Sequence, residues 1–170
     1  MILGLDISTS RIGITIMKTD EDLVFCDDIK MKTKDSLETR CMVLEKYISN
    51  LPHKFTYIFV EEPYMMFAGG KTTARTMAKL QRFNGMCCYM LLKLLNVHPI
   101  LIPANKARKT VGIVLKRGTC TKTKVIKFVE EKYDNFQVWY TRHGNPKPGT
   151  DDRADSVVVA LAGIKILGIK

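Results

Sequence analysis

Short apolar runs near the start of the chain predict three consecutive strands. They cover residues 2–8, 12–16 and 23–31, and brief polar connections separate them. Such short links suit an antiparallel meander. A strongly β-prone run at 56–60 predicts a fourth, buried strand that ends at Glu61-Glu62-Pro63, and residues 100–102 predict a short fifth strand that Pro103 stops.

In other segments, apolar residues recur every three or four positions, which is the period of a helix. One such stripe runs from Leu37 to Leu51, and Asp35 with Glu38 predicts a capping box at its start. Further helical patterns cover about 73–95, 122–133 and 151–167. Gly85 lies inside the longest of them, where glycine costs about 1 kcal/mol relative to alanine. We therefore expect Gly85 to pack closely against another backbone.

The predicted order of elements is β-β-β-α-β-α-β-α-α. A meander followed by β-α units predicts an α/β fold with a mixed five-stranded sheet, in which the meander is antiparallel and the later strands are parallel. Helices are expected on both faces of the sheet. The chain has 170 residues without an internal repeat or a Gly/Ser-rich linker, so we expect one domain over residues 1–170.

Composition and charge narrow the class of function. Hydrophobic residues make up 46% and charged residues 26%, and no apolar run is long enough to span a membrane. The start of the chain has an acid, Asp6, inside its apolar run, unlike a signal peptide. None of the five cysteines belongs to a Cys-x-x-Cys pair, which predicts reduced thiols in the cytoplasm. The net charge of +10 favours a polyanionic partner, above all nucleic acid.

Acidic side chains stand at the ends of three predicted elements. Asp6 interrupts the first strand, Glu61 and Glu62 end the fourth, and Asp152 and Asp155 lie three positions apart at the start of the last helix. Each acid taken alone is also explained by a solvated strand end or by the positive end of a helix. Taken together they can converge in one place, and the pattern leaves open which of the two glutamates takes part.

Crowded carboxylates repel one another, and a divalent cation relieves that repulsion. Oxygen ligands without histidine or cysteine suit Mg²⁺, with Mn²⁺ as a substitute. Two such ions, about 3.5–4 Å apart, stabilise both the attacking and the leaving oxygen of a phosphoryl displacement. The acids therefore predict a two-metal site for phosphodiester hydrolysis.

Three segments resemble the RuvC-type Holliday junction resolvases of bacteria and phages, which belong to the ribonuclease H-like superfamily. The segments are Ile2-Leu-Gly-Leu-Asp6-Ile-Ser-Thr, Ile58-Phe-Val-Glu61-Glu62-Pro and Asp152-Arg-Ala-Asp155-Ser-Val-Val-Val-Ala. The likeness spans nearly the whole chain. It implies the ribonuclease H fold, a homodimer, and metal-dependent nicking of four-way DNA junctions.

The resemblance implies a role for each matching position. Asp6, Glu61, Asp152 and Asp155 match the catalytic, metal-binding acids of the family, with Glu62 as the alternative to Glu61.

Basic and aromatic positions match as well. The segment from Arg108 to Gly112 resembles the basic stretch before the family's catalytic lysine, which Lys122 fits best and Lys124 second. Tyr64 lies where the family places an aromatic that stacks at the branch point; packing under its own loop is the alternative. The implied DNA-binding residues are Tyr64, Arg108, Lys109, Lys116, Arg117 and Lys124.

Two regions depart from the family's pattern. The region around Gly69-Gly70 looks extended, and so does the segment 133–150, which carries Trp139, Tyr140, Arg142 and His143. Aromatic and basic residues together suit a DNA contact, but a plain surface insertion explains them equally well. The preferred branch structure stays open, and forks and flaps are further expected substrates.

The homodimer has a candidate surface on the helix at about 73–95. Its apolar residues lie on more than one face, so that one face can cover the sheet while another binds a second copy, through residues that include Met86, Tyr89, Met90 and Leu92.

Two other classes of protein compete with the nuclease. Residues 4–9 also resemble the first phosphate motif of the actin-like and sugar-kinase superfamily, but that class needs a second similar domain and a glycine-rich adenosine motif, which this sequence lacks. The other class is a ribonuclease H-like module that binds DNA without cutting it. All four acidic positions are filled, which favours the enzyme.

Overall fold

The computed structural model describes residues 1–64, 73–115 and 120–170, and it contains a five-stranded sheet. The strands are β1 (Ile2–Ile7), β2 (Arg11–Met17), β3 (Leu23–Lys30), β4 (Tyr57–Glu62) and β5 (Pro99–Pro103), in the spatial order β3-β2-β1-β4-β5. The pairs β1–β2 and β2–β3 are antiparallel, whereas β1–β4 and β4–β5 are parallel. The predicted mixed sheet is confirmed.

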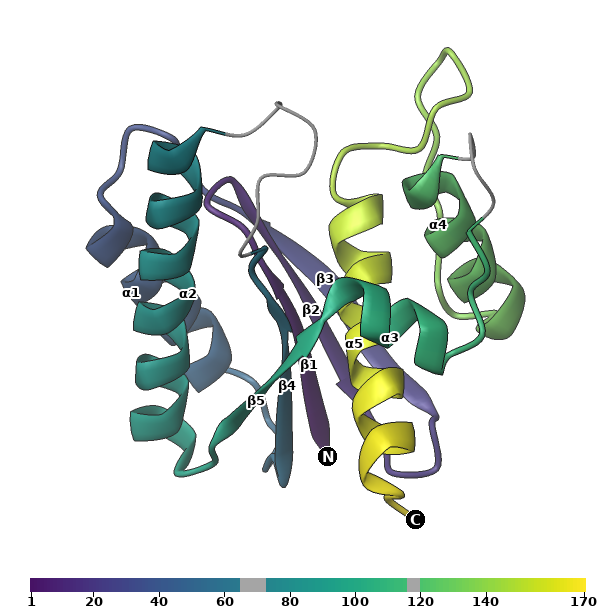
Figure 1. Cartoon of the computed structure of the whole chain (residues 1–170), viewed down its shortest axis with the longest axis horizontal. Coiled ribbons are helices and arrows are strands. Elements are labelled where there is room, and N and C mark those ends of the chain that lie inside the picture. The colour runs from purple at the N-terminus through teal and green to yellow at the C-terminus, as the bar shows by residue number, and fades with distance from the viewer. Residues whose placement is uncertain (65–72, 116–119) are drawn as a thin grey trace.

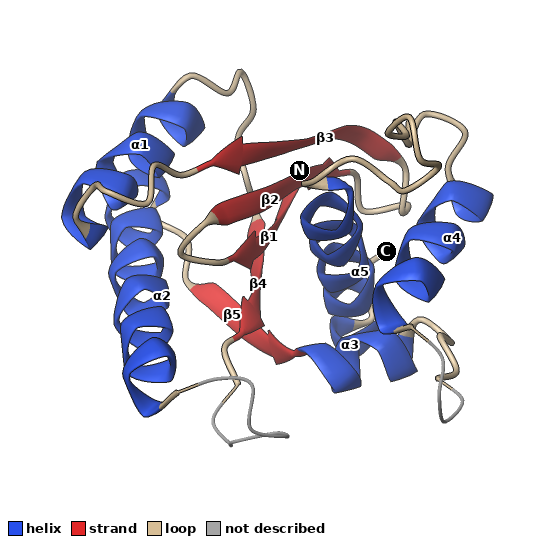
Figure 2. Cartoon of the chain, turned by 90° about the horizontal axis from the view of Figure 1, so that it is seen from above, coloured by secondary structure: helices blue, strands red, loops and turns tan. Residues whose placement is uncertain are grey.

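Helices cover both faces of the sheet, as predicted (Figures 1 and 2). Helices α1 (Leu37–Ser49) and α2 (Ala74–Leu95) lie on one face, and α5 (Thr150–Leu167) crosses the other. Helices α3 (Ala104–Thr110) and α4 (Thr121–Lys132) pack against α5. In the described parts of the chain, no helix combines the length and the apolar character needed to cross a membrane.

The sequence does not predict α3. This helix has only seven residues, follows Pro103 directly and buries just two small side chains, Ala104 and Ala107. A helix of about two turns is too short to show a recognisable period of apolar residues.

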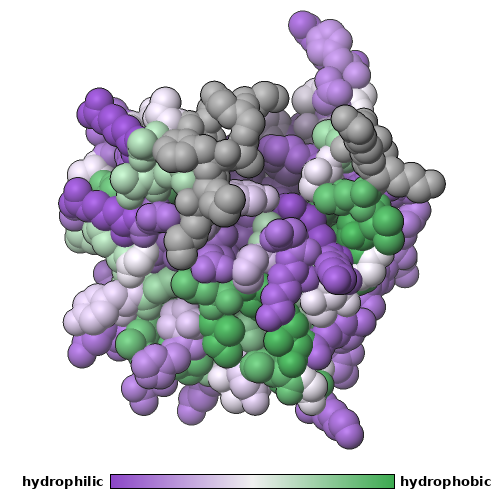
Figure 3. All heavy atoms as spheres, viewed as in Figure 1, coloured by the Kyte–Doolittle hydropathy of each residue, from purple (hydrophilic) through white to green (hydrophobic). Residues whose placement is uncertain are grey.

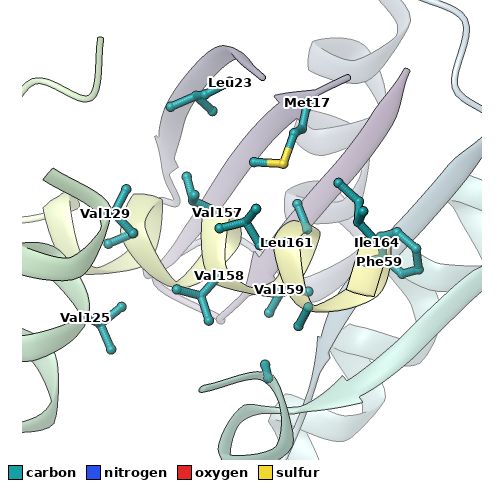
Figure 4. Close-up of a cluster of buried hydrophobic side chains, with 14 of the residues drawn as sticks. Met17, Leu23, Phe59, Val125, Val129, Val157, Val158, Val159, Leu161 and Ile164 are labelled. Carbon is teal, nitrogen blue, oxygen red and sulfur yellow. The ribbon is translucent and has the colours of Figure 1, made fainter. Parts of the chain in front are cut away.

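The two faces of the sheet carry separate apolar cores, because strand side chains alternate between the faces. Leu5 and Val60 belong to the core beneath α1 and α2, whereas Ile2 and Phe59 belong to the core beneath α5. Figure 4 shows this second core, where α5 lies between the sheet and α4; its labelled members are Met17, Leu23, Phe59, Val125, Val129, Val157, Val158, Val159, Leu161 and Ile164.

Two local predictions are wrong. The N-cap of α1 is Ser36, whose hydroxyl accepts a hydrogen bond from the backbone N–H of Thr39 at 3.1 Å, so Asp35 stands outside the cap. Serine is as good a cap as aspartate, and it lies at the position from which a side chain reaches the third helical N–H. A Cβ built on Gly85 would meet no described atom within 4 Å, because this side of α2 is exposed.

Candidate active site

Asp6 and Glu61 lie next to each other at one end of the sheet, on the face that α5 covers. The strands β1 and β4 run parallel with Leu5 opposite Val60, so the next residue of each strand is one of these acids. Since Leu5 and Val60 point to the α1/α2 core, the alternation of side chains turns Asp6 and Glu61 towards α5 and Glu62 towards the opposite face. The register therefore brings Glu61, rather than Glu62, beside Asp6.

A glycine lets the start of α5 approach this end of the sheet. Gly13 is the cross-strand partner of Asp6, and a Cβ built on it would lie 1.9 Å from the backbone oxygen of Asp152. The hydroxyls of Thr15 and Ser156 form a buried hydrogen bond of 2.7 Å between β2 and α5. The first turns of α5, which carry two acids, are thereby held against the strand ends that carry the other two.

The four predicted acids are close enough to raise one another's pKa. Burial raises the pKa of Asp6 well above its ordinary value, and the charges of Glu61, Asp155 and Asp152 raise it further. Burial, followed by the charge of Asp155, raises the pKa of Glu61 to about 7. Burial also raises the pKa of Asp155, and it raises that of Asp152 to about 6 with a contribution from Asp151. The structure thus brings all four acids into one cluster.

Two arginines lie against the acids of α5. Nη2 of Arg108, from α3, is 3.3 Å from Oδ1 of Asp155, and its charge opposes the effect of burial on the pKa of that acid. Nε of Arg11, from β2, is 3.8 Å from Oδ2 of Asp152, and Arg11 also pairs with Asp28. Arg108 is one of the DNA contacts predicted from the sequence, whereas Arg11 is not, because a lone basic residue at a strand end carries no signal of its own.

Lys122, the predicted catalytic lysine, forms an ion pair with Asp151 rather than with one of the four acids. Burial is the largest single influence on the pKa of Asp151 and acts to raise it, but the hydrogen bond from Lys122, the charge of Lys122 and backbone hydrogen bonds together lower that pKa. The Lys122 side chain is 70% exposed, so its ammonium is accessible at the rim of the cluster. Lys124, the second candidate, donates to the carbonyl oxygen of Val114 at 3.0 Å.

The remaining residues predicted to contact DNA are Tyr64, Lys109, Lys116 and Arg117. Tyr64 lies two residues beyond the end of β4, is 55% exposed, and is near enough to Arg108 to raise the pKa of that guanidinium. Lys109 is exposed on α3. Lys116 and Arg117 lie outside the described residues.

The chemistry of the cluster fits a divalent cation. Among the described residues, no three acidic, histidine or cysteine side chains surround one point closely enough to hold an ion as they stand. Instead, Asp152 lies 3.8 Å from Arg11 and Asp155 lies 3.3 Å from Arg108. The four carboxylates nevertheless form an all-oxygen donor set of the kind that Mg²⁺ and Mn²⁺ prefer, and their raised pKa values mean that their charge is costly without a cation.

The cluster predicts how stability depends on pH in the metal-free protein. The pKa of Glu61 rises from 4.5 to about 7 and that of Asp152 from 3.8 to about 6, so the folded chain retains protons that the unfolded chain releases. Their contribution to the free energy of unfolding is therefore complete at low pH and is lost as pH rises from about 4 to about 7. Each unit of pKa shift corresponds to about 1.4 kcal/mol, so we expect a loss on the order of a few kcal/mol.

Denaturant unfolding between pH 4 and pH 8 with a chelator present measures this loss. The decline should be smaller in Glu61→Gln, which cannot ionise, and Mg²⁺ should restore stability to the wild-type protein at neutral pH because it binds only the folded chain. Identical pH profiles for wild type and Glu61→Gln would contradict the proposed burial of this acid in the cluster.

Neither a protein-family model nor a curated protein matches this sequence. Solved structures match the fold of the chain, and three resolvases are among them. RuvC of Thermus thermophilus, in complex with a Holliday junction substrate, has 12% identity and a TM-score of 0.66, over 98% of this chain and 94% of that chain. The yeast mitochondrial Holliday junction resolvase has 13% identity and a TM-score of 0.58, over 96% of this chain and 77% of that chain. A Fowlpox virus resolvase in complex with Holliday junction DNA has 16% identity and a TM-score of 0.50, over 98% of this chain and 97% of that chain.

The low identities make this a likeness of fold, and it extends over nearly the whole chain. The chain therefore has the fold of the RuvC-type Holliday junction resolvases.

Proposed function

We propose that this chain is a divalent-metal-dependent endodeoxyribonuclease that resolves Holliday junctions and related branched DNA by paired nicks. The observation that carries the proposal is the position of Asp6, a buried acid surrounded by the charges of Glu61, Asp152 and Asp155. Such an arrangement stabilises no fold by itself, because buried like charges repel. The net charge of +10 and the fold shared with resolvases support DNA as the partner. The five cysteines are all free, which suits a protein of the cytoplasm.

The proposal gives each group of residues a task. Asp6, Glu61, Asp152 and Asp155 would hold two Mg²⁺ ions, which supply a Lewis acid and lower the pKa of a bound water. Arg108 contacts Asp155 at 3.3 Å, so it would orient that acid and balance the charge of the cluster. Asp151 holds the exposed ammonium of Lys122 at the rim, where a phosphate oxygen of the cut strand would accept a hydrogen bond from it.

A comparison of DNA substrates tests the proposed function. Four-way, three-way, flap and duplex DNA of matched sequence are incubated with the wild-type protein in Mg²⁺. We expect the branched molecules to be nicked near the branch and the duplex to stay intact. Equal cutting of duplex and branched DNA would point to a non-selective nuclease, and binding of all four without any cutting would favour the inactive DNA-binding module.

Tyr64 is proposed to stack on a base at the open branch point. Tyr64 is 55% exposed and lies near Arg108, which contacts the acid Asp155. Stacking on an aromatic ring contributes about 1–3 kcal/mol per base in single-strand binding. We therefore expect Tyr64→Ala to slow cleavage of an intact junction about tenfold or more without lowering the melting temperature, while Tyr64→Phe stays near wild type.

A junction with unpaired bases at its centre sharpens this prediction. It needs no opening, so it should be cut by Tyr64→Ala almost as fast as by wild type. If this substrate fails to rescue Tyr64→Ala, or if the variant unfolds at a lower temperature, Tyr64 has a packing role instead.

We also propose that the chain acts as a homodimer, because paired nicks in a nearly two-fold symmetric junction need two related active sites. Apolar side chains stay exposed where α1 and α2 meet: Met42 and Tyr89 are each 66% exposed and Val43 is 40% exposed. Met42 and Tyr89 border a groove of about 360 Å³ that Met86 also lines. Of the residues that the sequence suggests, Tyr89 remains available to a partner, whereas Met90 lies in the core.

Met42→Asp should convert the dimer into a monomer, because it places a charge in the proposed interface. The side chain is largely exposed in the single chain, so the fold should persist and only the association should fail. Light scattering at micromolar concentration measures the mass, with the exposed Lys54→Asp as control. A wild-type monomer that still makes paired nicks would argue against the dimer.

A further inference from the structure

The segment between α4 and α5 forms a hairpin-like loop that we call the 139–147 hairpin. The backbone N–H of Lys147 donates to the carbonyl of Trp139 at 2.7 Å, and that of Thr141 donates to the carbonyl of Asn145 at 2.8 Å. Gly144 closes the turn with a φ of +76°, which glycine adopts without strain. Figures 1 and 3 show the loop projecting beyond the body of the protein above the start of α5, with a hydrophilic tip.

The hairpin is fixed to the helix that carries the acids. Arg153 is buried on α5, next to Asp152, and it donates to the carbonyl of Gln137 at 2.8 Å. Its guanidinium also lies over two rings, 5.1 Å from the centroid of Phe136 and 4.6 Å from that of Trp139. These contacts give the stem of the hairpin a defined position relative to the cluster.

The residues that join the 139–147 hairpin to α5 form one wall of the hollow beside the acids. This hollow has a volume of about 460 Å³, and Pro148 and Gly149 line it together with Lys122, Asp151 and Asp152. A DNA strand whose phosphate reaches the cluster would therefore pass close to the hairpin.

The hairpin carries the chemistry that binds unpaired nucleotides. Trp139 and Tyr140 are each 51% exposed, although burying such rings would stabilise the fold. Arg142, His143 and Lys147 are exposed beside them, and no acidic residue occurs from 135 to 150. Aromatic rings that stack on bases, alternating with cations that bind phosphates, are the usual means of holding a single strand. Packing on Arg153 explains one contact of Trp139, but both rings stay 51% exposed.

We propose that the 139–147 hairpin is a second DNA-binding element, which holds unpaired nucleotides next to the branch point. Bases stack on Trp139 and Tyr140, and phosphates bind Arg142 and Lys147. This inference rests on the proposed action on branched DNA, and it adds a contact that the four acids and Tyr64 do not supply.

The chain offers a direct probe, because Trp139 is its only tryptophan. The wild-type protein, with a chelator present so that no strand is cut, is titrated with a labelled single-stranded oligonucleotide and with a four-way junction. Tryptophan emission and the anisotropy of the DNA label are recorded together. We expect the emission to be quenched along the same binding curve as the anisotropy. Full binding with unchanged emission would overturn the proposal.

Variants separate a contact from a distant effect on the fluorophore. Tyr140→Ala and Arg142→Ala should each weaken single-strand binding about tenfold, or about 1.4 kcal/mol. Tyr140→Phe keeps the ring and should bind like wild type, as should Lys54→Ala, a control for an exposed cation between α1 and β4. Wild-type affinity in both Tyr140→Ala and Arg142→Ala would contradict the contact.

The outcome is distinguishable from a failure of the proposed function. Asp6→Asn leaves the hairpin untouched, so its tryptophan should be quenched like that of wild type. If the wild-type protein never cuts DNA but its tryptophan is still quenched on binding, the nuclease proposal fails and the hairpin proposal stands. If junctions are cut normally while the hairpin variants bind like wild type, the hairpin proposal fails alone.

Discussion

Asp6→Asn should lower the rate of junction cleavage by several orders of magnitude while junction binding stays intact. Asp6 is the acid whose pKa all the others raise, and it lies between Glu61 on β4 and the acids of α5. An amide in its place keeps the shape of the side chain but removes the charge that two cations would share. Single-turnover cleavage of a four-way junction in Mg²⁺ measures the effect, and near-normal cutting by Asp6→Asn would exclude the proposed site.

The stability of the same variant separates a chemical role from a structural one. Asparagine carries no charge to bury, so the melting temperature of the metal-free protein should be unchanged or higher. Asp134→Asn is the matched control, because Asp134 is exposed just past α4 and is not among the charges that raise the pKa of Asp6; it should behave like wild type in both assays. A strongly lowered melting temperature in Asp6→Asn would mean that Asp6 holds the fold rather than a metal ion.

Gly13→Ala should damage both the fold and the site. The added Cβ would lie 1.9 Å from the carbonyl oxygen of Asp152, and the buried hydrogen bond between Thr15 and Ser156 opposes any retreat of α5. Overpacking of this kind costs about 1–3 kcal/mol, occasionally more. A shift of the α5 acids by about 1 Å would lower the cleavage rate about a hundredfold.

Denaturant unfolding and junction cleavage measure the two effects of Gly13→Ala. Gly85→Ala is the control, because it adds the same methyl group to an open position of a helix. That change should leave the chain as stable as before or raise its stability by about 1 kcal/mol. Wild-type stability and activity in Gly13→Ala would refute the close approach of α5 to β2.

The strands and the four acids could be predicted because each depends on a short stretch of sequence. The apolar runs around Asp6 and before Glu61 predict strand ends, and the Asp152–Asp155 spacing predicts two acids on one helix face. The choice between Glu61 and Glu62 needed the parallel register of β1 and β4, which pairs residues more than fifty positions apart. No local pattern contains that register.

The sequence does not predict one short helix and several contacts between segments that are distant along the chain. Helix α3 is too short to show a period, so the contact of Arg108 with Asp155 has no sequence signal. The Lys122–Asp151 ion pair joins two helices whose relative position only the packed core defines. Gly13 and Gly85 each lie inside a helix or strand, so the sequence does not distinguish them. Gly13 lies on the side of β2 that faces the backbone of α5, whereas Gly85 lies on an exposed side of α2.

The central claim is that the four acids form a metal-dependent nuclease centre for branched DNA. The most direct measurement follows cleavage of a labelled four-way junction by wild-type protein stripped of metal, before and after Mg²⁺ is added, with the nicks mapped on all four strands. We predict no cleavage in the chelator and, after addition of Mg²⁺, symmetric nicks on two opposing strands at the branch. Cleavage that persists without a divalent cation, or a bound junction that stays uncut in both Mg²⁺ and Mn²⁺, would contradict the account.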